Sequence, residues 1–383
     1  MPASRTVTVH AGSHDRAACP VSVLLPKGYN NAAVTLFDSG LKRAIPAQVF
    51  QLDDTNTLTW IEGRLKAHAT RKYKLVSKAT SFPVKVRLVD HTKSKLDVRV
   101  GNTLLTSYHY SHKWVRPFLH PLSGPGGVRV TRNWPVDRSV AGERRDHVHH
   151  KSVWVAHGEC DDMDNWSELP GHGFQRHQEF THVVSGPVFG ECQARIDWCD
   201  AKGRKRFEEL RTLRAYAVPG GSRLLDVVVS LRMTERTVTF KDTKEGGLLS
   251  VRVATSMEVN RGGRIENSYG GVNEEETWGK NAAWCDYSGL VDGKHVGIAV
   301  FDNEANPRYP TGWHVRNYGL MTANCFAWKY YRPGAGLVGD MKLPKGSTTT
   351  WRYRLYVHRG DARKGKVAAR YLDYVAPPQV TVQ

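Results

Sequence analysis

Short segments with the two-residue period of β-strands follow one another along almost the whole chain of 383 residues. After Pro83 they run from 84–90 to 349–358, and Gly, Pro, Asn and Asp separate them. Only the segment 362–374 shows apolar residues at helical spacing. So many strands in one stretch predict an all-β fold with two large packed antiparallel sheets and a C-terminal helix.

The first eighty residues predict a second, smaller unit. Short strand signals with turn residues between them are typical of a small β-sandwich, and they lie at 6–9, 19–25, 47–52, 58–62 and 71–76. The segment 77–82 before Pro83 is the predicted boundary. We therefore expect an accessory β-sandwich domain at 1–80 and the large β-domain at 83–375.

The charge of the chain predicts anionic partners. Lys and Arg number 55 against 37 Asp and Glu, which gives a net charge of +18. The basic residues are scattered along strands, and no zinc-finger spacing, helix-turn-helix pattern or RNA-binding aromatic signature is present, so nucleic acid is not expected as a partner. An acidic oligosaccharide explains the charge equally well.

Several function classes lack their sequence motifs. No phosphate-binding loop, dinucleotide fingerprint or Gly-x-Ser-x-Gly elbow occurs, so no cofactor is expected. The six cysteines lack Cys-x-x-Cys spacing and are predicted to be mostly buried free thiols. No apolar run approaches the ~20 residues of a membrane span, and no membrane partner is expected.

The N-terminus lacks the apolar region of a signal peptide. Two localisations stay open: the protein is cytoplasmic, or its secretion signal has been removed and it is periplasmic or secreted. The sequence leaves the oligomeric state open.

Four histidines fall within residues 146–158: His147, His149, His150 and His157. If a strand begins at about His147, alternation points His150 and Trp154 to one face and His149 and His157 to the other. A proton donor beside a flat aromatic ring is what a carbohydrate site requires, because sugar rings stack their C–H faces on aromatics. His150 and Trp154 are therefore candidate site residues.

A metal site is the alternative for these histidines. His147 and His149 could bind one ion, with a third ligand from His157, His172 or His177. No His-Glu-x-x-His or other specific spacing is present. A third alternative gives each histidine only a structural role.

Two further segments carry polar and aromatic residues. Asp242 and Glu245 enter a Gly-Gly turn, where paired carboxylates suit general base catalysis or sugar binding, unless they form only a solvated turn. In 306–319, a strand would place His314, Arg316 and Tyr318 on one face, which suits a carboxylate pocket. Trp278 lies in another aromatic loop, although a core position is an equal alternative.

The chain resembles a known family at these segments. The motifs occur in the family's order at 117–122, 126–128, 146–150, 241–247, 277–279 and 306–324. They resemble the DUF6807 family, whose members often carry the label "methane oxygenase PmoA", over roughly residues 83–375. The label is a poor guide, because a particulate methane monooxygenase subunit spans the membrane and this chain has no spanning segment.

The resemblance implies a carbohydrate-related bacterial protein with a β-supersandwich like that of galactose mutarotases. Such folds use a histidine acid with a carboxylate base, or a Tyr/His/Arg set. By analogy at the level of fold, these roles carry over to His149, His150, Glu245 and His314. Lys151 stands where many relatives have arginine, which weakens any claim for a guanidinium there.

We predict a carbohydrate-active enzyme of the hydrolase or lyase type, which acts on a glycoside or an acidic oligosaccharide by His/carboxylate acid–base catalysis. The candidate catalytic residues are His149, His150, Asp242, Glu245 and His314. The candidate substrate-binding residues are Trp154, Trp278, Arg308, Trp313, Arg316, Tyr318 and Asn324. The alternatives are a non-catalytic glycan-binding protein and a metal-dependent enzyme centred on the histidines.

Overall fold

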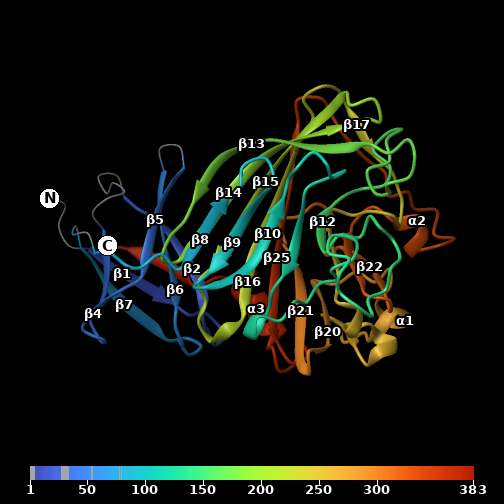
Figure 1. Ribbon diagram of the computed structural model, residues 1–383. Coiled ribbons are helices and arrows are strands. Elements are labelled where there is room, and N and C mark those ends of the chain that lie inside the picture. Colours follow the sequence, from blue (N-terminus) through green and yellow to red (C-terminus); the bar gives the residue numbers. More distant parts are fainter. Residues whose placement is uncertain (1–4, 27–33, 53–54, 77, 79) are drawn as a thin grey trace.

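The computed structural model describes residues 5–26, 34–52, 55–76, 78 and 80–383. Two eight-stranded sheets, antiparallel throughout, share one large hydrophobic core, to which both contribute alternate residues of their strands (Figure 1). The predicted all-β fold with large antiparallel sheets is confirmed.

The first of these sheets carries the candidate residues and is called the site sheet. Its strands, in spatial order, are β22 (Gly312–Arg316), β23 (Leu320–Asn324), β18 (Leu249–Arg252), β12 (Val153–Val155), β11 (Phe118–Leu122), β10 (Thr103–His109), β9 (Lys95–Val100) and β8 (Val86–Asp90). Strands far apart in the sequence therefore lie side by side in it. This order brings the segments around residues 154, 250 and 314 together.

The second sheet is called the back sheet. Its strands, in spatial order, are β13 (Phe174–Val184), β14 (Phe189–Cys199), β15 (Lys205–Tyr216), β16 (Arg223–Arg232), β25 (Thr348–Arg359), β21 (Lys294–Asp302), β20 (Trp284–Val291) and β19 (Arg264–Asn267). The strands β17 (Val238–Phe240) and β24 (Met341–Leu343) form a separate two-stranded sheet.

A smaller β-sandwich with its own core lies at the N-terminal side. Its sheets are β26-β1-β7-β3-β4 and β2-β6-β5, with β1 Arg5–His10, β2 Cys19–Leu24, β3 Thr35–Asp38, β4 Arg43–Ile45, β5 Ala47–Leu52, β6 Thr55–Glu62, β7 Thr70–Val76 and β26 Gln379–Val382. The last strand of the chain thus pairs with the first, and the C-terminus lies beside the blue N-terminal strands in Figure 1. In the predicted boundary segment 77–82, residues 77 and 79 lie outside the described part of the chain.

The predicted C-terminal helix is present as α3 (Val367–Val375). Its buried residues Val367 and Tyr371 pack with Phe301 of the back sheet. Two short helices were not predicted, α1 (Asn273–Thr277) and α2 (Trp328–Tyr331), and both lie near the β22 edge of the site sheet in Figure 1. Single 3-10 turns occur at Pro125–Gly127, Pro219–Gly221, Thr255–Met257 and Val259–Arg261.

All six cysteines are buried and unpaired, as predicted. Within the described ranges, no helix has the length and apolar character needed to cross a membrane.

Candidate functional site

The outward face of the site sheet gathers the predicted residues. Trp154 lies opposite Ser250, which lies opposite Thr322, which lies opposite His314. Residues directly opposite in an antiparallel pair point to the same face. This row therefore connects the two segments that the sequence had singled out, 146–158 and 306–319.

A parallel row two residues away carries two arginines on the same face. Arg316 lies opposite Leu320, and Leu320 lies opposite Arg252. The alternate residue Trp313 points the other way, into the core between the sheets. Strand alternation in β22 is thus as predicted for His314 and Arg316.

The histidine segment does not form the predicted strand. Residues 146–152 form a turn and loop, and β12 begins only at Val153. His147 and Ser152 adopt left-handed backbone angles, with φ of 37° and 58°. The buried Arg132 donates hydrogen bonds to the carbonyls of His147 and His150, which holds the turn.

This turn brings together three histidines that alternation would have separated. The ring centroids of His147 and His150 are 4.7 Å apart, and those of His149 and His150 are 4.4 Å apart. His157 lies elsewhere, against Phe240 and Phe326. The predicted division of the four histidines between two faces is therefore wrong for all but His157.

Four aromatic rings form a stacked column. Tyr318 stacks on His147 at 5.3 Å and 12°, His147 on His150 at 4.7 Å and 3°, and His150 on Trp154 at 5.1 Å and 18°. Trp154 and His150 are each only 1% exposed, whereas the His147 side chain is 40% exposed. Trp154 therefore forms the buried end of the column and has no exposed face on which a sugar ring could stack, contrary to the prediction.

Asp146 is held between two buried guanidiniums. Arg132 donates to its Oδ1 at 2.5 Å, and Arg252 donates to Oδ1 and Oδ2 at 2.9 and 3.2 Å. Burial alone would raise the pKa of Asp146. The hydrogen bond from His147 and the charges of Arg252 and Arg132 outweigh it and hold that pKa well below its ordinary value. The carboxylate is therefore ionised at neutral pH.

Asp146 and His147 form a dyad. The Nδ1 atom of His147 lies 3.2 Å from Oδ1 of Asp146. An ionised carboxylate at this position fixes the proton on Nδ1 and leaves Nε2 free to accept or donate a proton. The left-handed backbone of His147 is uncommon for a residue other than glycine, and such strain concentrates at functional sites.

His150 has a different protonation state from the predicted general acid. Arg252 Nη1 lies 3.0 Å from its Nδ1, and a guanidinium only donates, so Nδ1 accepts and the neutral ring carries its proton on Nε2. Burial, with His149 and Arg252 nearby, holds the pKa of His150 well below its ordinary value. His150 is thus a fixed neutral donor, and its buried Nε2 has no hydrogen-bond partner among the described residues.

His149 is also neutral. Burial, followed by the charge of Arg116, lowers its pKa to about 3. Its ring meets that of Trp166 edge to face at 5.9 Å. Like His150, it does not fit the role of a general acid at neutral pH.

His314 lies at the other end of the row with Trp278 and Arg316. The His314 and Trp278 rings are 6.4 Å apart, and the Arg316 guanidinium lies 5.6 Å from the Trp278 ring centroid. Arg316 also pairs with Glu274 at 2.5 Å. Burial, then the charges of Arg316 and Lys244, lower the pKa of His314 to about 3.

The two predicted carboxylates differ in their surroundings. Asp242 is 1% exposed, and its Oδ2 accepts hydrogen bonds from the amides of Lys329 at 3.0 Å and Gly339 at 2.6 Å. Glu245 is 45% exposed and pairs with Lys244 at 2.6 Å. Asp242 Oδ2 therefore anchors backbone amides, while its buried Oδ1 has no hydrogen-bond partner among the described residues. Glu245 is the more exposed of the two carboxylates, and the catalytic roles of both stay predictions.

The Tyr318 phenol lies among the charges of this face. Burial raises its pKa, Arg252 and Arg316 lower it, and Glu245 and Asp146 raise it again, with a net upward shift. The phenol is thus protonated at neutral pH. Glu245 and Asp146 are thus both close enough to Tyr318 to affect its pKa.

Three predicted binding residues have structural positions instead. Trp313 is fully buried in the core, and its Nε1 donates to a backbone carbonyl at 2.9 Å. Arg308 donates to backbone carbonyls in 325–340. Asn324 donates to carbonyls of the 243–244 turn and so shapes the approach to Glu245.

Sequence reasoning missed Asp146, Arg132 and Arg252, and for His147 it offered a metal ligand or a structural residue, without a catalytic role. In the sequence, Arg252 is only one of the basic residues scattered along the strands. The available signal was the Asp146–His147 pair itself, next to each other in a histidine-rich segment. Within the described ranges, no group of three His, Cys, Asp or Glu side chains is arranged to hold a metal ion.

Comparison with known proteins gives a family match and distant structural likenesses. Residues 95–372 match the model of DUF6807, described as a family of unknown function. No curated protein matches the chain.

A solved structure of a protein in glycosyl hydrolase family 38 from Enterococcus faecalis is 10% identical with a TM-score of 0.48, and the match covers 99% of this chain and 47% of that one. An alpha-mannosidase from Enterococcus faecalis V583 is 8% identical with a TM-score of 0.47, over 100% and 46%. The chain thus spans about half the length of these two proteins.

Proposed function

The chain belongs to the DUF6807 family, and from that premise we propose that it is a carbohydrate-active enzyme in which His147 is the general acid–base residue. The family description assigns no activity, so the proposal rests on the site. The observation that carries it is the dyad: Asp146, fixed by Arg132 and Arg252, orients a half-exposed imidazole beneath Tyr318. A positioned histidine contributes about 10²–10⁴-fold to a rate.

The charge around the dyad favours an acidic sugar. Arg144 and Lys244 are each 37% exposed and Arg316 is 27% exposed, and each pairs with one glutamate, so a substrate carboxylate would bind them in competition with these pairs. Guanidinium and ammonium groups bind carboxylates well. The net charge of +18 attracts anionic chains to the protein as a whole.

A lyase reaction suits these residues better than hydrolysis. Glycoside hydrolysis generally uses two carboxyl groups that flank the bond, but Asp242 is bonded to backbone amides and Asp146 to two arginines. In the proposed β-elimination, His147 Nε2 takes the proton from the carbon next to the uronate carboxylate. The C–H electron pair forms a C=C bond as the C–O bond breaks, and the Tyr318 hydroxyl protonates the leaving oxygen.

The test is a screen of uronate-containing oligosaccharides, followed by the ultraviolet absorbance of the unsaturated uronosyl product. The wild type should form this product, and His147→Gln should lower kcat/KM by at least about 100-fold. His10→Asn, an exposed histidine of the N-terminal sandwich, is the matched control and should retain the wild-type rate.

Three outcomes would redirect the proposal. Equal rates for His147→Gln and the wild type would remove His147 from the mechanism. Cleavage without an unsaturated product would favour a hydrolase. Glycan binding without any product on long incubation would favour the non-catalytic binding protein.

A further inference from the structure

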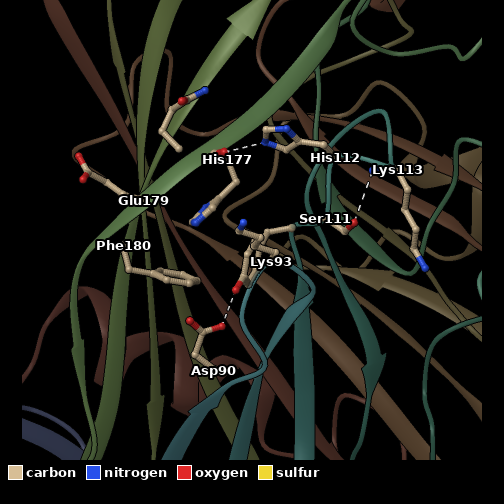
Figure 2. Close-up of a pocket in the computed structure, with 10 residues that line it drawn as sticks. Asp90, Lys93, Ser111, His112, Lys113, His177, Glu179 and Phe180 are labelled. Carbon is tan, nitrogen blue, oxygen red and sulfur yellow. Dashed lines mark hydrogen bonds between the residues drawn. The ribbon is translucent and has the colours of Figure 1, made fainter.

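A cavity away from the dyad lies where the edge strand β13 of the back sheet meets the β8–β9 turn of the site sheet (Figure 2). It encloses about 650 Å³, a volume typical of sites for small organic ligands. None of its lining residues belongs to the dyad or to its arginine frame. The function proposed above therefore leaves this cavity unexplained.

The floor of the cavity is aromatic and contains an unpartnered nitrogen. The rings of Tyr110 and Phe180 stand 5.3 Å apart at 89°, and His177 lies 4.4 and 4.5 Å from them. His177 is only 8% exposed, and burial lowers its pKa to about 4, so the ring is neutral. Among the described residues its buried Nδ1 has no hydrogen-bond partner. Buried polar atoms are nearly always paired, so this atom indicates a ligand or water.

The backbone of β13 is irregular at this point. The pairing of β13 with β14 shifts between His177 and Glu179 and again between Phe180 and His182. β-Bulges re-aim side chains and occur next to functional sites. Figure 2 shows His177 and Phe180 pointing from β13 toward the side of the cavity formed by Lys93 and Asp90.

The rim of the cavity carries two carboxylates, Asp90 and Glu179, and two lysines, Lys93 and Lys113. Both of its carboxylates are already engaged: Asp90 accepts a hydrogen bond from Tyr110 at 2.5 Å, and Glu179 pairs with Arg195 at 3.0 Å. The two ammonium groups, of Lys93 and Lys113, have no carboxylate within ion-pair distance in the part of the chain that the structure describes. An ammonium group without an ion-pair partner, such as that of Lys93, can bind the carboxylate of a ligand.

We infer that this cavity is a second, non-catalytic subsite that binds one uronic acid unit. The pyranose C–H face packs on Phe180, a hydroxyl group exchanges a hydrogen bond with His177 Nδ1, and the carboxylate pairs with the ammonium group of Lys93. The inference rests on the proposed function in one respect: an enzyme for acidic polysaccharides gains from a second site that holds the same chain.

The test is a ligand-observed NMR titration of the full chain with galacturonate and with galactose, two probes that differ in the carboxylate. Galacturonate should bind at least about tenfold more tightly than galactose, because a hydrogen bond between two charged groups is stronger than one between neutral groups. Lys93→Met and Phe180→Ala should each weaken galacturonate binding by about tenfold or more. Lys202→Met, an exposed lysine of the β14–β15 turn that does not line the cavity, is the matched control and should change nothing.

The variant His147→Gln separates this inference from the proposed function. Galacturonate binding that survives His147→Gln but falls in Lys93→Met and Phe180→Ala supports the cavity, whatever the activity screen gives. Binding that is lost in His147→Gln and unchanged in the two cavity variants overturns the inference and leaves the dyad proposal standing. Equal affinity for both sugars, or no binding of either, also overturns it.

Discussion

His147 and His150 are three positions apart in the sequence, but the His147 side chain is 40% exposed and His150 is only 1% exposed. The sequence located the imidazoles, but exposure and partners decide which of them can transfer a proton. His150 faces a guanidinium that can only donate, so its free nitrogen already carries a proton. His147 faces a carboxylate, which leaves its outer nitrogen available. Asp146 directly precedes His147, but Arg252, which contacts His150, and Arg132, which fixes Asp146 together with Arg252, have no local pattern around residue 147.

Asp146→Asn should lower the free energy of unfolding by about 2–3 kcal/mol. The change removes the negative charge between Arg132 and Arg252, and breaking a buried pair costs about 3–5 kcal/mol. We expect less here because 29% of the Asp146 side chain reaches solvent. Urea unfolding measures the change.

Asp137→Asn is the matched control for Asp146→Asn. Asp137 is 36% exposed and lies 3.8 Å from Arg129 in a surface ion pair, so its loss should cost at most about 1 kcal/mol. Equal losses for the two variants would contradict the role given to the arginine frame.

Local strand patterns predicted some elements well and others poorly. In β22, alternation correctly placed His314 and Arg316 on one face, because both neighbours of His314 in the sequence pack in the core. In 146–152 the same rule failed, because Arg132 binds two carbonyls of the segment and holds it in a turn. Trp313 was predicted to bind substrate, although alternation in β22 points its side chain to the face opposite His314.

Trp313→Leu tests this alternation. It should lower the free energy of unfolding by about 2–4 kcal/mol, because a large fully buried ring is lost from the core. Once a substrate is known, its KM should stay within about twofold of the wild type, since the indole faces the other sheet. A large rise in KM with unchanged stability would show that Trp313 contacts substrate after all.

For the whole molecule, composition and strand period were sufficient to predict an all-β fold, but not the order of strands. In the β22-β23-β18-β12 row, Ser250 pairs with Thr322, 72 positions away, and the pairing of β26 with β1 joins Val7 to Val382, 375 positions away. Such pairings have no local signature in a single sequence. The convergence of residues 146, 252 and 318 therefore could not be predicted, although most of the strands could.

Deletion of residues 376–383 should destabilise the N-terminal sandwich by about 1–2 kcal/mol. The deletion removes β26, whose Val380 and Val382 are half-buried against that core, and it exposes the edge of β1. Limited proteolysis should then cut first within 5–76. If the shortened chain resists the protease in this region as well as the full chain does, β26 contributes little to the stability of the N-terminal sandwich.

Acid should destabilise the protein between about pH 6.5 and pH 4. Burial is the main cause that lowers the pKa of His109, His120, His157 and His177 to about 4, whereas the ordinary value is 6.5. In this window the unfolded chain binds more protons than the folded one, so stability rises with pH and is lost as pH falls. Urea unfolding at several pH values measures the slope.

His157→Gln provides the comparison for this slope. The substituted amide can still donate to the Lys241 carbonyl, which His157 contacts at 3.0 Å, but it does not titrate. The number of protons taken up on unfolding, which the slope of the unfolding free energy against pH gives, should therefore fall by close to one. An unchanged slope would contradict the neutral state of buried His157.

The most direct test of the proposed dyad is chemical rescue of His147→Gly. Glycine suits the left-handed backbone at this position, and removal of the imidazole leaves a slot between the rings of Tyr318 and His150. We predict that the variant loses at least about 100-fold in kcat/KM on the wild-type substrate and that added imidazole restores part of the rate. A His147→Gly enzyme as fast as the wild type would contradict the account.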